Sequence, residues 1–380
     1  MSERVNFRFP TAIHFGSGAR DSLAEFARDH QVERPLVVTD KAMVSTEAYR
    51  LVKQTCDKTW PNGWTVFDGV HPNPLAADAD DALKAYRAGR CDGVIALGGG
   101  SAIDGAKALL LRIAEPGCPL QETDLAALPE KIVPLCAIPT TAGTGSEVGR
   151  STVVTVPALG RKIVLGAPAL LPTLAILDPV LTVGLPAHLT AATGMDAMTH
   201  AIESFVCPMF HPMCDGIALE AIYRIAQYLP RAVKNGEDLQ ARGEMLVAAA
   251  MGAVAFQKDL GAAHSMAHPL SSEFDVHHGL ANAIVLPAVI RFNGEKDSQQ
   301  YDRVAKALGI FDATDPANAV ADYIDGLNEQ LELTRRLRDL NIPQSAIDTL
   351  ASKAFDDGCH LTNPRKCQRD DFVRLYRECW

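Results

Sequence analysis

Apolar residues form short continuous runs in the first half of the chain and recur at helical spacing in the second half. The short runs have the length and the β-branched composition of strands that are buried on both faces. They lie at 35–40, 93–97, 132–138 and 174–178. Helical patterns at 43–57 and 76–90 fall between the first two runs, separated by the turn-rich segment 71–74. Strands that alternate with helices predict βαβ units and a parallel sheet.

Beyond residue 178 the pattern consists of long stretches with apolar residues at helical spacing, at 190–206, 214–230 and 239–258. These stretches predict an all-helical second domain. The boundary is placed at Pro186, because proline disfavours helix in the preceding residue and the helical pattern begins just after it. A chain of 380 residues is also long for a single core. We therefore expect an α/β domain at 1–185 and an all-helical domain at 186–380.

Charge and composition narrow the partners and the compartment. The net charge is −10, and no block of five or more basic residues occurs, which argues against nucleic acid and anionic membrane as partners. No uninterrupted apolar stretch reaches the roughly 18 residues of a membrane span, and the N-terminus carries charges where a signal peptide needs an apolar run. The nine cysteines, an odd number without a CxxC pair, indicate reduced thiols. A cytoplasmic protein is expected.

Two glycine-rich loops follow predicted strands. The segment GGGSAIDGAK (98–107) opens a helix, where it forms either a tight turn or a cradle of backbone N–H groups for a pyrophosphate. It matches neither G-x-G-x-x-G nor the P-loop. The segment PTTAGTGSEV (139–148) follows the next strand. Since both loops leave a parallel sheet at the same edge, they favour a bound nucleotide. Asp40 ends an earlier strand there, either as a helix N-cap or as an acceptor for ribose hydroxyls, which would favour NAD over NADP.

Carboxylate and imidazole groups cluster in the second half. Asp196 and His200 are four residues apart, as are His264 and His268, so each pair lies on one face of a helix. The neighbouring His277 and His278 follow in the same segment, and spacing does not decide between them. One carboxylate with several imidazoles predicts a divalent metal site for Fe(II) or Zn(II).

The ordered motifs of the chain resemble those of the iron-dependent (group III) alcohol dehydrogenases. The resemblance rests on the two glycine-rich loops and on AATGMDAMTHAIE (191–203), HSMAHPL (264–270) and HHGLANAIVLP (277–287). It implies a Rossmann-like dinucleotide-binding domain, an all-α domain in a dehydroquinate synthase-like architecture, a metal in the cleft between them, and a homodimer or larger assembly. The implied metal ligands are Asp196, His200, His264 and His278, where the family's Pro-His-Gly pattern selects His278 over His277. His268 corresponds to a non-ligating catalytic histidine. The residues implied to border the cofactor are Asp40, Asn73, Gly99, Gly100, Ser101, Thr140, Thr141, Thr144 and Lys162.

The implied reaction is hydride transfer between an alcohol and NAD(H), with Fe(II), or alternatively Zn(II), activating the alcohol oxygen. His268 either relays the alcohol proton or orients a ligand. Two rivals share the fold: a metal-independent reductase like maleylacetate reductase, which characteristically lacks the full ligand set, and an NAD/zinc lyase like dehydroquinate synthase.

The substrate is expected to be a short-chain primary alcohol or an ω-hydroxy acid such as 4-hydroxybutyrate. The segment around Phe256 is similar to the branch that includes 4-hydroxybutyrate dehydrogenases, and Cys359 stands where relatives carry a cysteine near the active site. Arg150 is either a surface residue or a partner for a substrate carboxylate.

Overall fold

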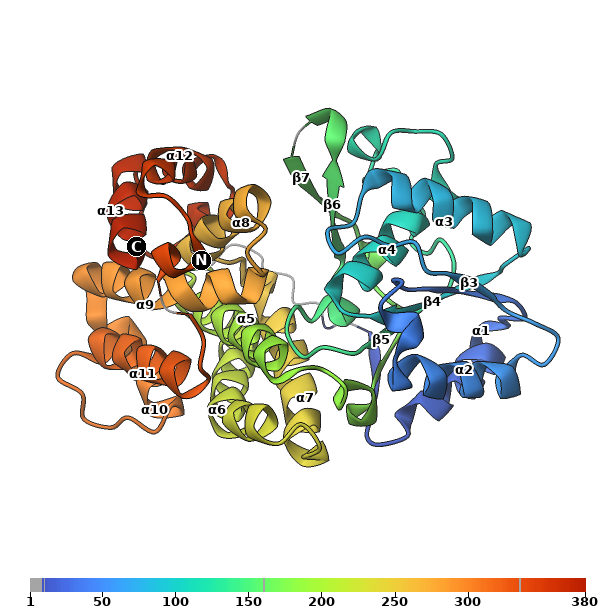
Figure 1. Cartoon of the computed structure of the whole chain (residues 1–380), viewed down its shortest axis with the longest axis horizontal. Helices are drawn as coiled ribbons and strands as arrows, with labels where there is room; N and C mark the ends of the chain where they lie inside the picture. The colour runs from blue at the N-terminus through green and yellow to red at the C-terminus, as the bar shows by residue number, and fades with distance from the viewer. Residues whose placement is uncertain (1–8, 10, 160, 335) are drawn as a thin grey trace, which may run out of the picture. The chain divides into compact units, whose positions relative to one another are not determined.

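The computed structural model describes residues 9, 11–159, 161–334 and 336–380, and the chain divides into two compact units (Figure 1). The α/β unit comprises Phe9–Leu185 together with Glu237–Leu246. The helical unit comprises Pro186–Gly236 and Val247–Trp380. Pro186 thus opens the helical unit, whereas 237–246, which lie within the expected helical domain, cluster with the α/β unit.

A six-stranded parallel sheet forms the centre of the α/β unit, in the order β1-β8-β5-β4-β2-β3. The strands are β1 (Ala12–Phe15), β2 (Pro35–Val38), β3 (Thr65–Phe67), β4 (Gly93–Gly98), β5 (Leu135–Pro139) and β8 (Leu174–Leu177). The expected α/β fold with a parallel sheet is therefore confirmed, and the four apolar runs are the four inner strands. The two edge strands, β1 and β3, are short and partly exposed, and the sequence pattern did not predict them.

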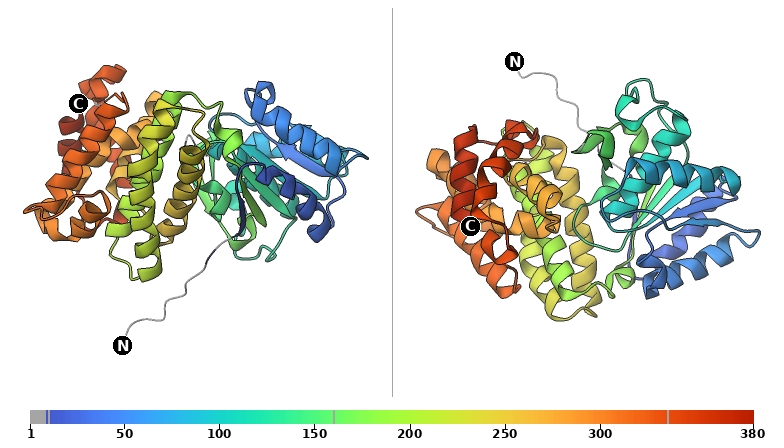
Figure 2. Two further views of the ribbon diagram at one scale, coloured as in Figure 1. Left: turned by 90° about the horizontal axis from the view of Figure 1, so that it is seen from below. Right: turned by 45° about the horizontal axis from the view of Figure 1, so that its top comes forward.

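Helices cover both faces of this sheet, giving three layers (Figure 2). On β4, Ile95 and Leu97 join one core with α1 (Leu23–His30) and α2 (Glu47–Thr59). Val94 and Ala96 join the other core with α3 (Ala76–Ala88) and α4 (Gly100–Ala114). Because successive side chains of a strand point to opposite faces, an inner strand covered twice must be apolar throughout.

An antiparallel hairpin of β6 (Ser151–Val156) and β7 (Arg161–Gly166) completes the α/β unit. Burial alternates along β6, with Thr152, Val154 and Val156 buried. Strand β6 packs on α4, so the hairpin lies against the helix that follows the first glycine-rich loop.

The helical unit consists of helices joined by short turns. Its helices are α5 (Ala187–Val206), α6 (Pro212–Lys234), α7 (Leu239–Ala255, whose first half clusters with the α/β unit), α8 (Ala262–Phe274), α9 (His278–Asp297), α10 (Asp302–Ala307), α11 (Pro316–Gln330), α12 (Ile347–Asp356) and α13 (Arg369–Cys379). Helix α5 is almost wholly buried and packs on α6 and α9, while α8 packs on α9. Helices α5, α8 and α9 therefore form the core from which the candidate metal ligands come.

Within the described residues, no single helix is long and apolar enough to cross a membrane, although the bent pair Leu239–Lys258 and Ala262–Phe274 meets the length and composition requirement jointly.

Candidate metal centre and cofactor loops

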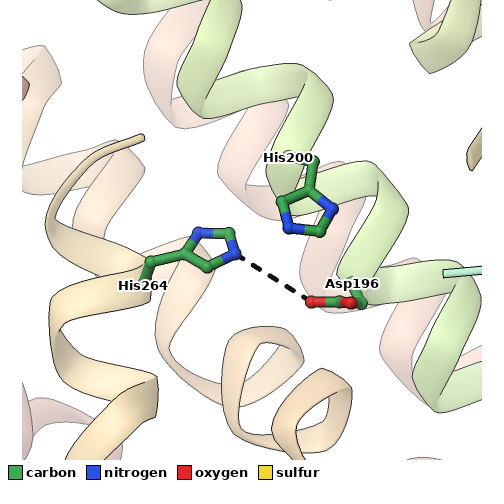
Figure 3. A group of neighbouring side chains, drawn as sticks. All are labelled: Asp196, His200 and His264. Atoms are coloured by element: carbon green, nitrogen blue, oxygen red, sulfur yellow. Dashed lines mark ion pairs between the residues drawn. The ribbon is translucent and has the colours of Figure 1, made fainter. Parts of the chain in front are cut away.

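Asp196, His200 and His264 converge in the core of the helical unit (Figure 3). Asp196 and His200 are one turn apart on the same face of α5, and His264 reaches them from α8. All three side chains are buried, and one ligand atom from each lies within 4.8 Å of the others. A buried carboxylate surrounded by imidazole nitrogens is a donor set that suits a divalent transition metal.

His278 brings a fourth donor to the same place. It is the first residue of α9, and its Nε2 lies 3.5 Å from Asp196 Oδ1. Its ring centroid is 5.4 Å from that of His264. His277 is the N-cap of α9 and its side chain is exposed. Of the two adjacent histidines, the structure brings His278 to Asp196.

The amide of Asn282 tests whether these residues fit a cation. Its Nδ2 lies 2.8 Å from Asp196 Oδ1 and 3.3 Å from both His264 Nε2 and His278 Nε2. An amide nitrogen has two hydrogens, so it cannot satisfy three acceptors. Among the described residues, Oδ1 of this buried amide has no hydrogen-bond partner. Asp196 Oδ1, His264 Nε2 and His278 Nε2 are therefore three acceptor atoms that share too few hydrogen-bond donors. A positive ion would satisfy all three, so these residues suit a divalent metal.

Glu203 fixes the orientation of the His264 ring. Its Oε2 lies 2.6 Å from His264 Nδ1, and its Oε1 accepts from the Ala263 N–H at 2.7 Å. Burial lowers the pKa of His264, but the hydrogen bond and charge of Glu203 outweigh it and the pKa is raised overall. Because the carboxylate accepts a hydrogen bond from Nδ1–H, the Nε2 lone pair faces Asp196, at 4.0 Å from Oδ1. Glu203 therefore orients the His264 ring so that Nε2 faces the other candidate ligands.

Asp196 is held in its ionised form. Burial opposes ionisation, but the neighbouring His200, His278 and His264 lower the pKa of this carboxyl to about 2. A carboxylate that stays charged while buried needs a cationic partner, and a divalent metal supplies one.

His268 lies beside the metal-ligand cluster, formed by the candidate ligands Asp196, His200, His264 and His278, without joining it. Its ring stacks on that of His278, with centroids 5.3 Å apart and an angle of 16° between the planes, and its side chain is 37% exposed. Nδ1 lies 2.8 Å from Asp357 Oδ2. Burial raises the pKa of Asp357, but the bonds from His268, Cys359 N–H and Ser265 lower it well below its usual range. The carboxylate therefore accepts a hydrogen bond from Nδ1–H of His268, which leaves the ring lone pair on Nε2.

The structure places the three expected substrate residues in different surroundings. The ring of Phe256 lies 5.2 Å from that of His200. Cys359 is half-buried and belongs to the group around Asp357. Arg150 is an exposed residue of the α/β unit, just before β6.

The two glycine-rich loops pack on each other at the carboxyl ends of β4 and β5. Thr140 N donates to Gly98 O at 3.0 Å. A Cβ atom on Gly100 would lie 2.7 Å from Thr144 Cγ2, and one on Gly99 would lie 3.4 Å from Thr141. Glycine is therefore required at Gly100 by the approach of the second loop. Helix α4 begins there, so its free N–H groups point out of this pair of loops.

The remaining expected cofactor residues lie around these loops. Asp40 Oδ1 caps the turn at Met43, accepting from its N–H at 2.9 Å, while a Cβ on Gly98 would lie 3.7 Å from Asp40 Oδ2. Lys162 Nζ donates to Asn73 Oδ1 at 2.8 Å, which joins the hairpin to the segment before α3. Ser101 Oγ donates to Pro72 O.

Lys107 and Asp104 hold the second loop in place, a role that sequence reasoning missed. The fully buried Lys107 ammonium donates to Ser146 O at 2.7 Å, Ser146 Oγ at 2.9 Å and Ser151 O at 2.8 Å. Asp104 accepts from Ser146 Oγ at 2.7 Å and from Val153 N at 3.1 Å. Burial lowers the pKa of Lys107 to about 8, against the charges of Asp104 and Glu147. Hydrogen bonds from α4 thus hold both the second glycine-rich loop and the β6–β7 hairpin in place.

Sequence signals existed for some of the missed residues around the metal-ligand cluster. Glu203 lies on the same face of α5 as Asp196 and His200, and Asn282 is one turn after His278 on α9. Asp357, 89 residues from His268, had no such signal.

Comparisons with known proteins cover nearly the whole chain. Residues 10–179 match the family model for iron-containing alcohol dehydrogenase, and residues 190–380 match the C-terminal model of the Fe-containing alcohol dehydrogenase family. The chain is 39% identical to the 4-hydroxybutyrate dehydrogenase of Cupriavidus necator, over 97% of this chain and 98% of that protein. It is 32% identical to the NAD-dependent methanol dehydrogenase of Bacillus methanolicus, over 98% and 99% respectively.

Solved structures agree with these matches. The crystal structure of a 1,3-propanediol oxidoreductase superposes with a TM-score of 0.95 at 32% identity, covering 100% of both chains. The resemblance inferred from the motifs is therefore confirmed: the chain is an oxidoreductase that belongs to the iron-containing alcohol dehydrogenase family.

Proposed function

We propose that this protein is an NAD-dependent alcohol dehydrogenase that interconverts a short-chain primary alcohol or ω-hydroxy acid and its aldehyde at a divalent iron centre. The observation that carries the proposal is that the buried Asp196, His200 and His264 converge and that His278 joins Asp196 and His264 around the Asn282 amide nitrogen. Asp196, His200, His264 and His278 would hold Fe(II), which would supply a Lewis acid for the alcohol oxygen, and NAD would supply the hydride acceptor.

Two carboxylates around the metal-ligand cluster fix which ring nitrogen of the neighbouring histidine carries the proton. Glu203 holds the Nδ1 proton of His264, so that Nε2 stays available to the metal. Asp357 does the same for His268, whose Nε2 then takes the proton that the alcohol gives up. The partial exposure of His268 gives that proton a way to solvent.

The cofactor is assigned to the loops of the α/β unit. The N-terminal turn of α4, with Gly99, Gly100 and Ser101, offers backbone N–H groups to the pyrophosphate. Thr140, Thr141 and Thr144 line the facing loop. Asp40, next to Gly98 at the end of β2, accepts from the ribose hydroxyls and repels a 2′-phosphate, which favours NAD over NADP. Lys162 and Asn73 border the same region as a bonded pair.

We infer an ω-hydroxy acid such as 4-hydroxybutyrate as the substrate class. The relative at 39% identity is a 4-hydroxybutyrate dehydrogenase. Arg150 is exposed, and a guanidinium binds a carboxylate through two parallel hydrogen bonds, so it is assigned to the substrate acid group. Phe256 and Cys359 are assigned to the alkyl part of the substrate.

The test begins with anaerobically purified protein, stripped with a chelator and reloaded with Fe(II) or with Zn(II). NADH formation is measured with 4-hydroxybutyrate, ethanol, butanol and propane-1,2-diol, and with NADP in place of NAD. The expected result is activity that requires the metal and NAD and is highest for the acid. Full activity without metal would support a metal-independent reductase instead.

A matched pair of variants tests the ligand assignment. His278→Ala should lose metal and activity together, whereas His277→Ala should keep both, because only His278 approaches Asp196. Arg150→Ala should raise KM for 4-hydroxybutyrate and leave KM for butanol unchanged. An equal effect on both substrates would remove Arg150 from the substrate site.

A further inference from the structure

His268, Asp357 and Cys359 form a second group of donors beside the proposed iron ligands. One ligand atom from each of the three lies within 4.8 Å of the others, and all three residues are partly exposed. The set combines an imidazole, a carboxylate and a thiol, which is a typical combination for zinc. Solvent access allows an ion to enter, unlike the buried donors of the first cluster.

The group is held in place before any ion binds. Ser265 Oγ donates to Asp357 Oδ1 at 2.8 Å and accepts from His360 N–H at 2.8 Å, so α8 fixes the turn that carries Asp357 and Cys359. The Cys359 N–H also donates to Asp357 Oδ1, at 2.8 Å. The other carboxylate oxygen, Oδ2, faces His268 Nδ1. Asp357 Oδ1 therefore holds the carboxylate in position, and Oδ2 faces His268.

We propose that His268, Asp357 and Cys359 form an inhibitory zinc site, separate from the proposed iron ligands, in which a zinc ion takes the places of the protons on His268 Nδ1 and Cys359 Sγ. Tetrahedral zinc places its N, O and S ligands about 3.4–3.6 Å from one another. His268 Nδ1 and Asp357 Oδ2 are 2.8 Å apart and separate by about 0.6 Å to admit the ion, while the thiol closes by about 1.2 Å at most.

Zinc binding releases one proton to solvent and moves another within the His268 ring. Burial and the Asp357 carboxylate, to which the thiol donates, raise the pKa of Cys359, so the thiol loses its proton to solvent only as the zinc–sulfur bond forms. The neutral His268 ring keeps one proton, now on Nε2, and ligates through Nδ1. With one thiolate and one carboxylate, the dication gives a neutral site, and a solvent molecule fills the fourth position.

Inhibition follows because both ring nitrogens of His268 are then occupied, Nδ1 by zinc and Nε2 by a proton, so the ring cannot accept the proton of the alcohol. That part rests on the proposed function, whereas binding does not. The thiolate gives zinc and copper an advantage over iron at this group, since soft ligands favour them. Excess zinc therefore occupies this group while iron remains with Asp196 and the three histidine ligands.

The test uses the iron-loaded enzyme. After one equivalent of Zn(II) is added and free metal removed, both metals are counted per chain, and NADH formation is followed. The expected result is one added zinc with iron retained, and activity that falls in proportion to bound zinc. Co(II) used in the same way should give the near-ultraviolet charge-transfer band of a cobalt–thiolate bond in the unmodified protein.

Cys359→Ser should lose the band and bind at least tenfold less zinc while retaining its iron. Cys118→Ser, a change at another half-buried cysteine, is the matched control and should behave like the unmodified protein. Release of iron in step with zinc uptake, or no thiolate band in the unmodified protein, would overturn the proposal. Zinc binding at Cys359 without inhibition would retain the site and refute its coupling to His268, and inactivity of the iron-loaded enzyme would count against the proposed function alone.

Discussion

Glu147 makes the stability of the α/β unit depend on pH. It lies in the second glycine-rich loop and is only 2% exposed. Burial raises the pKa of Glu147 from the ordinary value of 4.5 to about 7, although its own backbone N–H and Lys107 act in the opposite direction. A carboxyl whose pKa is higher in the folded state favours folding while protonated. That contribution is complete below about pH 4.5 and is lost as the pH rises through about 7.

The substitution Glu147→Gln keeps the size of the side chain and removes its ionisation. The difference between the two pKa values corresponds to about 3 kcal/mol in the free energy of unfolding. Of this, about 2.5 kcal/mol falls between about pH 5 and about pH 8. The variant should therefore gain stability over the unmodified protein by about that amount across this interval, and gain nothing further above it.

Urea unfolding followed by tryptophan fluorescence measures this locally, because Trp60 and Trp64 both lie in the α/β unit. A Trp380→Phe background removes the signal of the third tryptophan, which lies in the helical unit. Glu122→Gln, a change at an exposed glutamate of the same unit, is the control and should show no pH-dependent gain. A stability difference for Glu147→Gln that is the same at both ends of the interval would refute the reasoning.

Three further changes test the geometry around the proposed metal and the loops. Lys107→Met removes the donor of three hydrogen bonds that hold the second glycine-rich loop and the β6 strand. NADH affinity should therefore fall at least tenfold in a fluorescence titration, while metal content stays constant. Unchanged affinity would mean that the loop keeps its position without the ammonium. Glu203→Gln should weaken metal binding by roughly 10–100-fold in competition with a chelator, because a neutral amide orients His264 less firmly than a carboxylate. Gly100→Ala would place a methyl group 2.7 Å from Thr144, so it should raise KM for NAD more than it changes kcat; the reverse pattern in steady-state kinetics would contradict the packing argument.

The sequence predicted those strands whose side chains are buried on both faces of the sheet. The run at 93–97 is buried on both faces of the sheet, so continuous apolarity predicted β4. Strand β1 is an edge strand with Ile13 and Phe15 exposed, and its four residues carry neither an alternating nor a continuous pattern. The β6–β7 hairpin does alternate in burial along β6, but nothing local indicated that it would pack on α4.

For the site, local spacing predicted what one helix can bring together. The pair Asp196 and His200 needs only a helical turn, and it was predicted. Asn282 lies one turn after His278, but it was not predicted. The pairing of His268 with Asp357 depends on how α12 packs against α8, which no short pattern encodes. Lys107 is the strongest departure, because a lysine is expected at the surface and this one is fully buried.

The partner of β1 has a consequence for how the chain is made. Among the residues that the structure describes, strand β1 pairs only with β8, and Asp178, just after β8, accepts from Gly18 N–H across 160 residues of sequence. During synthesis, β2, β3, β4 and β5 can pair with one another before β8 has been made, and β1 has no partner until then. Docking of β1 is thus a late step with a large loop-closure cost. A nascent chain released before β8 would carry an unpaired strand and expose the edge of β5 that β8 normally covers.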